Sequence, residues 1–341
     1  MTVDLRSDTV TLPTEEMLSS MADAEVGDDG RTREDGRSED PAVRRLEDRS
    51  AELTGKQAAL FVPSGTFGNT LGALALSRGS DPIWVFERAH ILKSEKALFS
   101  RGLFGREYRE YGEVTNIPVA KSDHAPLLLV ENTVSSDAGR PLNSAELEHV
   151  AQLKQAGWSI HMDGARLFNA AVGTGESVES IVSSCDTVMF CLSKGLGAPI
   201  GSMLCGDRDT IGRSRVLRKQ LGGAMRQAGY VAAAGLAALE TPNIERLADD
   251  HRRARMLHEV IGSVDGATSH CRTNIISVHL SLPVAETVVD MLTGKGYRIR
   301  ALSTHELRVL THRGITDEQA RLAGEAVADC IVAAAKEKKE I

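Results

Sequence analysis

Short apolar runs alternate with longer amphipathic stretches along most of this 341-residue chain. A run of about five apolar residues is typical of a buried strand, whereas the stretches between them carry helical periodicity. This alternation predicts an α/β fold with a mostly parallel central sheet flanked by helices. The expected strands are Ala58–Val62, Pro82–Phe86, Leu127–Glu131, Ser159–Asp163, Thr187–Cys191 and Gly201–Cys205.

The helical stretches divide the chain into three parts. Helices are expected over Thr14–Met21, Phe67–Leu76, Ser144–Gln155, Val178–Ser184 and Asn243–Ile261. The last of these leads into a smaller α/β region that is predicted as strand 275–280, helix 284–294, strand 307–310 and helix 316–336. We therefore expect an N-terminal arm (residues 1–20), a large domain (21–240) and a small C-terminal domain (241–341).

Composition argues against several classes of protein. No run of eighteen apolar residues occurs, so a membrane span is not expected, and a net charge of -7 argues against nucleic acid as a partner. The five cysteines are odd in number and form no Cys-x-x-Cys pair, so we expect neither disulfides nor a metal site. The chain begins without an apolar signal segment, from which we expect a cytoplasmic location.

A lysine and an aspartate each follow an expected strand. Lys194 lies in a Ser-Lys-Gly turn after the run that ends at Cys191, and Asp163 closes the strand that begins at Ser159. At the rim of an apolar sheet, desolvation penalises the ammonium and makes the neutral amine available as a nucleophile. Either motif alone is more often an ordinary turn. A lysine together with an acid supplies the Schiff-base partner and the ring-nitrogen carboxylate that pyridoxal 5'-phosphate requires.

A possible phosphate site adds to this pair. Ser64-Gly65-Thr66 connects an expected strand to an expected helix. Gly65 permits close backbone approach, Thr66 offers a hydroxyl, and the free N–H groups at a helix start attract phosphate. Ordinary helix capping is the alternative for this turn taken alone. Phosphate turn, acid and lysine, each after a strand, together predict a pyridoxal phosphate enzyme.

The chain resembles the low-specificity L-threonine aldolases over essentially its whole length. Two motifs carry most of the likeness, Asp163-Gly164-Ala165-Arg166 and Ser193-Lys194-Gly195-Leu196-Gly197. Further matches follow in the same order along the chain: Leu5–Thr11, Gly27–Asp29, Ser38–Pro41, Ser64–Thr66, Glu131–Thr133, Gly222–Gln227 and Arg308–His312. The resemblance implies the fold type I architecture of pyridoxal phosphate enzymes and a homotetramer, a dimer of dimers whose sites are shared between subunits.

The resemblance also implies roles for residues around the cofactor. Lys194 would form the Schiff base, Asp163 would hold the ring nitrogen and His90 would stack on the ring. Gly65 and Thr66 would bind the phosphate. Arg226 would add a positive charge to it, from the same or a neighbouring subunit. His90 lies between Ala89 and Ile91, so a core histidine is the alternative for that residue.

Other residues are implied on the substrate side of the site. Arg308 and Ser7 would bind the α-carboxylate of the substrate, with the arginine bidentate. Arg166 would reach the phenolic oxygen of the cofactor or the substrate carboxylate, and a structural ion pair is the alternative. For the base that takes the β-hydroxyl proton three alternatives stay open, His90, a water or a basic residue such as Lys219, which we also expect near the substrate.

Three segments depart from the family pattern. Val134 replaces the histidine that usually follows Glu-Asn-Thr, and Lys93–Phe99 replaces a stretch rich in glycine and small residues. Gly30–Arg37 brings Arg31, Arg33 and Arg37 where the family has a shorter link with a tyrosine. We expect these changes on the substrate side, although a solvated surface loop is the alternative for Gly30–Arg37.

The sequence therefore supports one function and keeps two alternatives. The first is a carbon–carbon lyase that cleaves a β-hydroxy-α-amino acid to glycine and an aldehyde. The second is an elimination lyase or transferase of specialised metabolism on the same cofactor, and the third is a non-catalytic cofactor-binding protein. Because Val134 cannot bond a β-hydroxyl and the inserted arginines suit an anionic side chain, we expect threonine to be a poor substrate.

Overall fold

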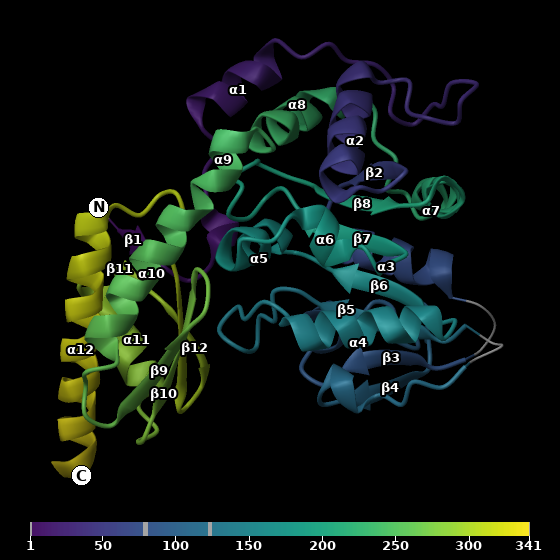
Figure 1. Ribbon diagram of the computed structural model, residues 1–341. Helices are drawn as coiled ribbons and strands as arrows, with labels where there is room; N and C mark the ends of the chain where they lie inside the picture. The colour runs from purple at the N-terminus through teal and green to yellow at the C-terminus, as the bar shows by residue number, and fades with distance from the viewer. Residues whose placement is uncertain (1, 78–80, 122–124, 341) are drawn as a thin grey trace.

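The computed structural model describes residues 2–77, 81–121 and 125–340. Its centre is a seven-stranded sheet with the order β2-β8-β7-β6-β5-β3-β4 (Figure 1). The strands are β2 (Ala58–Val62), β3 (Ile83–Phe86), β4 (Tyr108–Tyr111), β5 (Leu127–Glu131), β6 (Ser159–Asp163), β7 (Thr187–Cys191) and β8 (Ser202–Gly206). The strands from β3 to β7 run parallel, whereas β8 is antiparallel to both of its neighbours. The predicted mostly parallel sheet is confirmed, and each expected strand lies within one residue of its predicted bounds.

The sequence prediction missed β4. This strand has the sequence Tyr-Arg-Glu-Tyr, and only its last residue is buried. It lies at the edge of the sheet, where one side of the strand faces solvent, so it lacks the apolar run from which the other strands were predicted.

Helices cover both faces of the sheet (Figure 1). They are α2 (Pro41–Thr54), α3 (Gly65–Leu76), α4 (Ser144–Gln155), α5 (Leu167–Thr174), α6 (Val178–Val182), α7 (Arg208–Gln220) and α8 (Gly229–Ala238). Side chains alternate along each strand, so Phe61 packs in one core with α2 and α8 while Leu60 and Val62 pack in another with α7. β5 and β7 are buried at every residue, as expected for central strands covered on both faces.

A second, four-stranded antiparallel sheet has the order β12-β13-β10-β9. Its strands are β9 (Ala267–Cys271), β10 (Ile275–Leu280), β12 (Arg300–Ser303) and β13 (Glu306–Leu310), packed with α10 (Leu247–Ile261), α11 (Ala285–Gly294) and α12 (Asp317–Glu340). The single long helix expected over 243–261 is divided at Arg246 into α9 (Thr241–Glu245) and α10. The predicted division at residues 240 and 241 falls immediately before α9. None of the described helices combines the length and the hydropathy that a membrane crossing requires.

The N-terminal segment connects the two sheets. β1 (Val3–Asp4) pairs in parallel with β11 (Tyr297–Arg298), and the N–H of Leu310 donates to the carbonyl of Leu5 at 2.8 Å. A short 3-10 turn (Asp8–Val10) follows, and α1 (Glu15–Ala22) then packs on α8. This path carries the segment around Ser7 from the small sheet toward the large one.

Candidate active site

Lys194 lies in a tight turn directly after β7. The N–H of Gly197 donates to the carbonyl of Lys194 at 2.9 Å, and the N–H of Ala198 donates to that of Leu192 at 3.0 Å. Gly197 has a φ of +88°, a left-handed conformation that glycine adopts without strain. The lysine side chain is half-buried. The strand-to-turn placement expected from the sequence is therefore present, whereas the role of Lys194 stays a prediction.

Asp163 ends the neighbouring strand, β6. It is 5% exposed, and its Oδ1 accepts the N–H of Ala165 at 3.1 Å. The next residue ties the strand to β7, because the N–H of Gly164 donates to the carbonyl of Met189 at 2.8 Å. Asp163 and the Lys194 turn thus lie at the same edge of the sheet, the carboxyl ends of its parallel strands. Open α/β sheets bind their ligands at this edge.

His90 follows β3 at the same edge. Burial by the surrounding protein lowers the pKa of the imidazole, and this outweighs the opposing charge of Asp163. The positive charges of Lys194, Arg166 and Arg308 lower it further. His90 therefore lies within the electrostatic influence of four predicted site residues. The surrounding protein covers only part of His90, which is exposed as a residue, so it is not the core histidine that the sequence left as an alternative.

Arg166 forms a buried ion pair, the role that the sequence left as the alternative for this residue. Its Nε and Nη2 donate to the two carboxylate oxygens of Asp8, each at 2.7 Å. Asp8 is fully buried and also accepts from Nδ2 of Asn274 at 3.2 Å. Burial would raise the pKa of Asp8, but the charge and hydrogen bonds of Arg166 outweigh it and lower the pKa to about 2. Arg166 therefore has the structural pairing, and its contact with cofactor or substrate stays a prediction.

Arg308 lies on β13, opposite Ser277 of β10. Its Nε is buried and has no hydrogen-bond partner among the described residues. Burial and the neighbouring positive charges of Arg166 and Arg300 lower its pKa to about 10. A buried guanidinium nitrogen without a partner, set among other cations, favours the binding of an anion. Ser7 lies on the arm segment that is bonded beside β13, where it caps the turn that begins at Asp8.

The predicted phosphate turn starts α3. Ser64 is the N-cap residue, and its Oγ accepts the N–H of Phe67 at 3.2 Å. Gly65 and Thr66 are the first two helical residues, so their N–H groups have no carbonyl partner within the helix and point outward from its N-terminus. A Cβ at Gly65 would lie 2.9 Å from Sγ of Cys191, so a larger residue would collide with the end of β7. The geometry fits an anion held by backbone N–H groups.

Two acids near this edge, the half-buried Glu95 and the buried Glu131, were not assigned a role from the sequence. Glu95 accepts from Nδ2 of Asn69 at 3.2 and 3.3 Å, and therefore lies against α3, the helix of the phosphate turn. The placement of Lys93–Phe99 on the substrate side stays a prediction. Glu131 ends β5 and is 7% exposed. Burial and the charge of Asp163 raise the pKa of both carboxyls to about 7. The signal for Glu131 was present in the sequence, since an acid at the end of an apolar strand matches the position of Asp163.

Arg226 and Lys219 bind another part of the chain. Nη1 of Arg226 lies 3.0 Å from both carboxylate oxygens of Asp28, and Nζ of Lys219 donates to the carbonyl of Gly30 at 3.2 Å. Both side chains are exposed. Within one subunit, therefore, neither side chain is hydrogen-bonded to the predicted site residues around Asp163. Their roles in the site stay predictions. Their segment nevertheless passes the phosphate turn, because Gly223 packs against the ring of Phe67.

The arginine-bearing segment forms an exposed hairpin. Thr32 and Ser38 make an antiparallel bridge, and the N–H of Arg33 donates to the carbonyl of Arg37 at 2.9 Å. Arg37 folds back on α2, where Nη2 lies 2.6 Å from Oδ1 of Asp48. Arg31 lies 3.4 Å from Asp28. In this subunit the hairpin is a solvated surface loop, the alternative left open by the sequence, and two of its three arginines already have acidic partners.

Val134 is buried in the core beside a cavity. Its N–H donates to the carbonyl of Arg140 at 2.8 Å, which closes a loop after β5. The cavity measures about 180 Å³. It is lined by apolar and charged side chains, among them Phe86, Tyr111, Glu131, Val134, Arg140 and Glu146. The position at which the family usually has a histidine thus packs against apolar neighbours.

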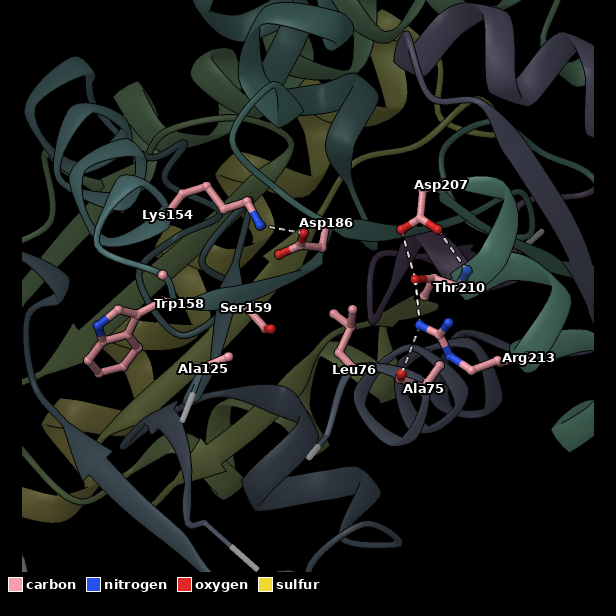
Figure 2. Close-up of a pocket in the computed structure, with 11 residues that line it drawn as sticks. Ala75, Leu76, Ala125, Lys154, Trp158, Ser159, Asp186, Asp207, Thr210 and Arg213 are labelled. Carbon is pink, nitrogen blue, oxygen red and sulfur yellow. Dashed lines mark hydrogen bonds and ion pairs between the residues drawn. The ribbon is translucent and has the colours of Figure 1, made fainter. Parts of the chain in front are cut away.

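A different cavity opens at the opposite edge of the sheet. Figure 2 shows its lining, which includes Lys154, Asp186, Asp207 and Arg213. These side chains bind one another or nearby backbone. Nζ of Lys154 lies 2.5 Å from Oδ1 of Asp186, and Asp207 caps α7 by accepting from Thr210. The cavity contains none of the predicted site residues.

The sequence and the fold match known proteins. The profile of the "Beta-eliminating lyase" family matches residues 4–105 and 113–282. A protein of Arabidopsis thaliana named "Probable low-specificity L-threonine aldolase 2" is 40% identical over 338 residues, which cover 93% of each chain. The "Low specificity L-threonine aldolase" of Escherichia coli K12 is 35% identical over 93% of this chain and 96% of its own. The solved threonine aldolase of Leishmania major superposes with a TM-score of 0.77 at 18% identity, covering 96% of this chain and 99% of its own.

Proposed function

The chain belongs to the beta-eliminating lyase family and, within it, to the low-specificity L-threonine aldolases, and we propose that it cleaves a threonine-like amino acid to glycine and an aldehyde. The cofactor is pyridoxal 5'-phosphate. The observation that carries this proposal is that Asp163 and the Lys194 turn end the neighbouring strands β6 and β7 at the carboxyl edge of the sheet, while Arg308 of the small sheet keeps a buried Nε without a described partner. An amine, a carboxylate and an anion-binding guanidinium are the groups that this chemistry requires.

The described residues fit the cofactor. When bound, pyridoxal phosphate accepts the electron pair of the bond that breaks at the α-carbon. Gly65 and Thr66 would hold its phosphate, because the N-terminus of α3 presents N–H groups and leaves no room for a side chain at Gly65. Lys194 would bind it covalently, and Asp163 would keep a proton on the ring nitrogen. The backbone N–H of Ala165 fixes the carboxylate of Asp163 for this purpose.

Arg308 would bind the α-carboxylate of the substrate. Its buried Nε lacks a partner among the described residues, so a carboxylate would satisfy a hydrogen-bond donor that the protein leaves open. Arg166 stays paired with Asp8, and this pair holds the N-terminal segment of Ser7 against the site. Ser7 and Arg308 would together fix which bond of the α-carbon is broken.

His90 is the group that one subunit offers to accept the proton of the β-hydroxyl. Its lowered pKa keeps the imidazole neutral near pH 7, so that it can take a proton directly or through a water. As the Cα–Cβ bond breaks, the hydroxyl proton leaves, Cβ–O becomes the aldehyde carbonyl, and Cα is later protonated to give glycine. Val134 can take no part in this transfer, and Lys219 of the same chain binds Gly30 instead.

The alternative of an elimination lyase or transferase is not favoured. The relatives are named as threonine aldolases over more than nine-tenths of both chains. A non-catalytic role would leave Lys194, Asp163 and the open donor of Arg308 without an explanation. The hairpin arginines also give little support to an anionic substrate, because Arg31 and Arg37 already bind acids of their own subunit.

We further propose a homotetramer in the cytoplasm. Leu12 is 78% exposed and its backbone lies beside Gly197 of the lysine turn, while Ile200 of the same loop is 42% exposed. Exposed apolar side chains next to the site support its completion by another subunit, as do the positions of Arg226 and Lys219. The cysteines of the described chain are free thiols, which fits a reducing compartment. Sedimentation of an active monomer would contradict the assembly.

Product analysis tests the proposed function. The purified protein with pyridoxal phosphate is incubated with L-threonine and with L-allo-threonine, and acetaldehyde and glycine are measured. Equal amounts of the two products support aldol cleavage. Formation of a keto acid and ammonia without aldehyde would instead establish elimination.

A further inference from the structure

The carboxylate of Glu131 joins two loops at the edge of the sheet. Its Oε2 accepts the backbone N–H of His90 at 2.8 Å, and its Oε1 accepts the backbone N–H of Ser135 at 2.7 Å. His90 follows β3, whereas Ser135 lies in the loop after β5. Both oxygens of one buried side chain are therefore used to bind the main chain of two separate segments.

This carboxylate lies beside the catalytic group. Glu131 and Asp163 are directly opposite each other on the parallel strands β5 and β6. On the side of the proposed active site, the charged and titratable groups near Glu131 are Asp163, Arg166 and His90. On its other side lies the cavity that Val134 also lines, where the groups are Tyr111, Arg88, Glu113, Asp137, Arg140 and Glu146. On the cavity side Arg140 is already bound to Asp137 and Glu146, with its Nε 2.7 Å from Oδ2 of Asp137 and its Nη1 2.7 Å from Oε2 of Glu146.

We propose, resting on the proposed function, that Glu131 is a positioning residue that fixes the backbone of His90 and thereby holds the imidazole over the site. The imidazole is attached to the main chain at His90. The hydrogen bond from the N–H of His90 to Glu131 ties this main chain to the end of β5. An N–H group bonds more strongly to an ionised carboxylate than to a neutral acceptor. Glu131 touches the His90 backbone and acts through that residue.

Ionisation of Glu131 gives the proposal a distinctive pH dependence. Burial and Asp163 raise the pKa of this carboxyl to about 7. The ionised form offers two acceptor oxygens, whereas the protonated form has a hydroxyl on one of them. The hydrogen bond between Glu131 and the N–H of His90 should thus strengthen as the pH rises through about 7. We expect kcat/KM to rise over the same pH range.

The test replaces Glu131 in the full-length holoenzyme. Glu131→Gln keeps the size of the side chain and one acceptor oxygen, but its amide nitrogen cannot accept a hydrogen bond. We expect faster hydrogen exchange at the amides of His90 and Ser135 and a weaker circular dichroism signal of bound pyridoxal phosphate. We expect kcat/KM for threonine to fall roughly ten- to a hundredfold, the range for losing a hydrogen bond to a charged group. The rise of kcat/KM near pH 7 should disappear.

Glu146→Gln is the matched control. Glu146 lines the same cavity and is partly buried, but it binds Arg140 and caps α4 through Asn143. This variant should lower Tm without changing exchange at His90, kcat/KM or the pH profile. Glu131→Asp keeps the charge but shortens the side chain, so it should be impaired like the glutamine variant.

Three results would overturn the proposal. They are unchanged exchange at His90 and Ser135 in Glu131→Gln, full activity of Glu131→Asp, and an equal loss of activity in Glu146→Gln. Absence of acetaldehyde from the parent enzyme would reject the proposed function instead. Hydrogen exchange and the dichroism of the bound cofactor would then still decide the role of Glu131.

Discussion

The two edges of the central sheet use charged residues differently. At the amino edge, the cavity of Figure 2 is lined by charges that bind one another: Lys154 pairs with Asp186, and Oδ2 of Asp186 also accepts the N–H of Ile160 at 2.8 Å. At the carboxyl edge, Asp163 and Glu131 are bound by backbone N–H groups of described residues, and Nε of Arg308 has no described partner. Paired charges stabilise a fold, whereas charges held by the backbone keep their field available for a ligand.

The difference teaches that a cavity with charged walls is a weaker sign of a site than unbalanced charge. At the carboxyl edge the half-buried Glu95 and the buried Glu131 have their pKa raised to about 7, which is an arrangement that costs stability. The following predictions test this comparison.

Lys194→Ala should have the largest effect. Loss of the amine that follows β7, the strand beside that of Asp163, should abolish aldehyde formation and the visible absorbance of bound cofactor, while circular dichroism shows an intact fold. Borohydride reduction followed by peptide mapping checks the assignment. A reduced adduct on another lysine of the variant would contradict it.

Asp163→Asn should lower kcat by roughly a hundred- to a thousandfold, the usual result of removing one preorganised electrostatic partner. The amide retains an oxygen for the N–H of Ala165, so the fold should be preserved. Asp186→Asn at the other edge is the control, and steady-state kinetics should show its kcat to be unchanged. Equal losses in both variants would remove the distinction between the edges.

Val134→His adds a polar group to the carboxyl edge. If Val134 leaves the β-hydroxyl of threonine without a partner, a histidine should raise threonine turnover roughly tenfold. The neighbouring cavity of about 180 Å³ gives the larger ring some room. Acetaldehyde release by parent and variant is the measurement. Efficient cleavage by the parent with no gain in the variant would show that threonine is an ordinary substrate here.

Glu95→Gln should reveal the stability cost of unbalanced charge. Burial and Asp163 raise the folded pKa of Glu95 to about 7, above its ordinary value of 4.5. The contribution of the Glu95 carboxyl to the free energy of unfolding is thus fully present below about pH 4.5 and is lost as the pH rises through about 7. The variant should therefore gain on the order of 1–3 kcal/mol over the parent between pH 5 and pH 8. Urea unfolding of the protein without added cofactor measures this, and a pH-independent difference would refute it.

Lys154→Met should have the smallest effect. The pair with Asp186 is partly exposed, with 41% and 21% of the two side chains accessible, so about 0–1 kcal/mol of stability should be lost. Thermal unfolding and kinetics should show a slightly lower Tm and unchanged kcat/KM. A large loss of activity would mean that the amino edge takes part in function.

Local sequence was sufficient to predict the position of a residue where that position depends on its near neighbours in the chain. Asp163 and Lys194 could be placed at strand ends because one ends and the other follows a short, largely apolar run, a pattern typical of a buried strand. Ser64 caps α3 because its hydroxyl reaches the N–H three residues later. In contrast, β4 lies at an edge and has no such run, so its pattern resembled a loop.

The contacts that complete the site join distant parts of the chain. Arg166 meets Asp8 across 158 positions, and Glu131 binds His90 across 41. Arg226 binds Asp28 across 198, which separates it from the lysine turn within one subunit. No periodicity encodes such pairings, since they depend on which strands become neighbours and on how the N-terminal segment crosses between the two sheets.

The sequence by itself therefore determined the α/β class, the strand ends that carry the lysine and the aspartate, and the phosphate turn. These features follow from short-range burial and hydrogen bonding. Tertiary structure alone decided which charges are neutralised and which remain open to a ligand. How strongly two charges interact depends on their distance in space, and that distance is set only when the sheets and the arm have packed together.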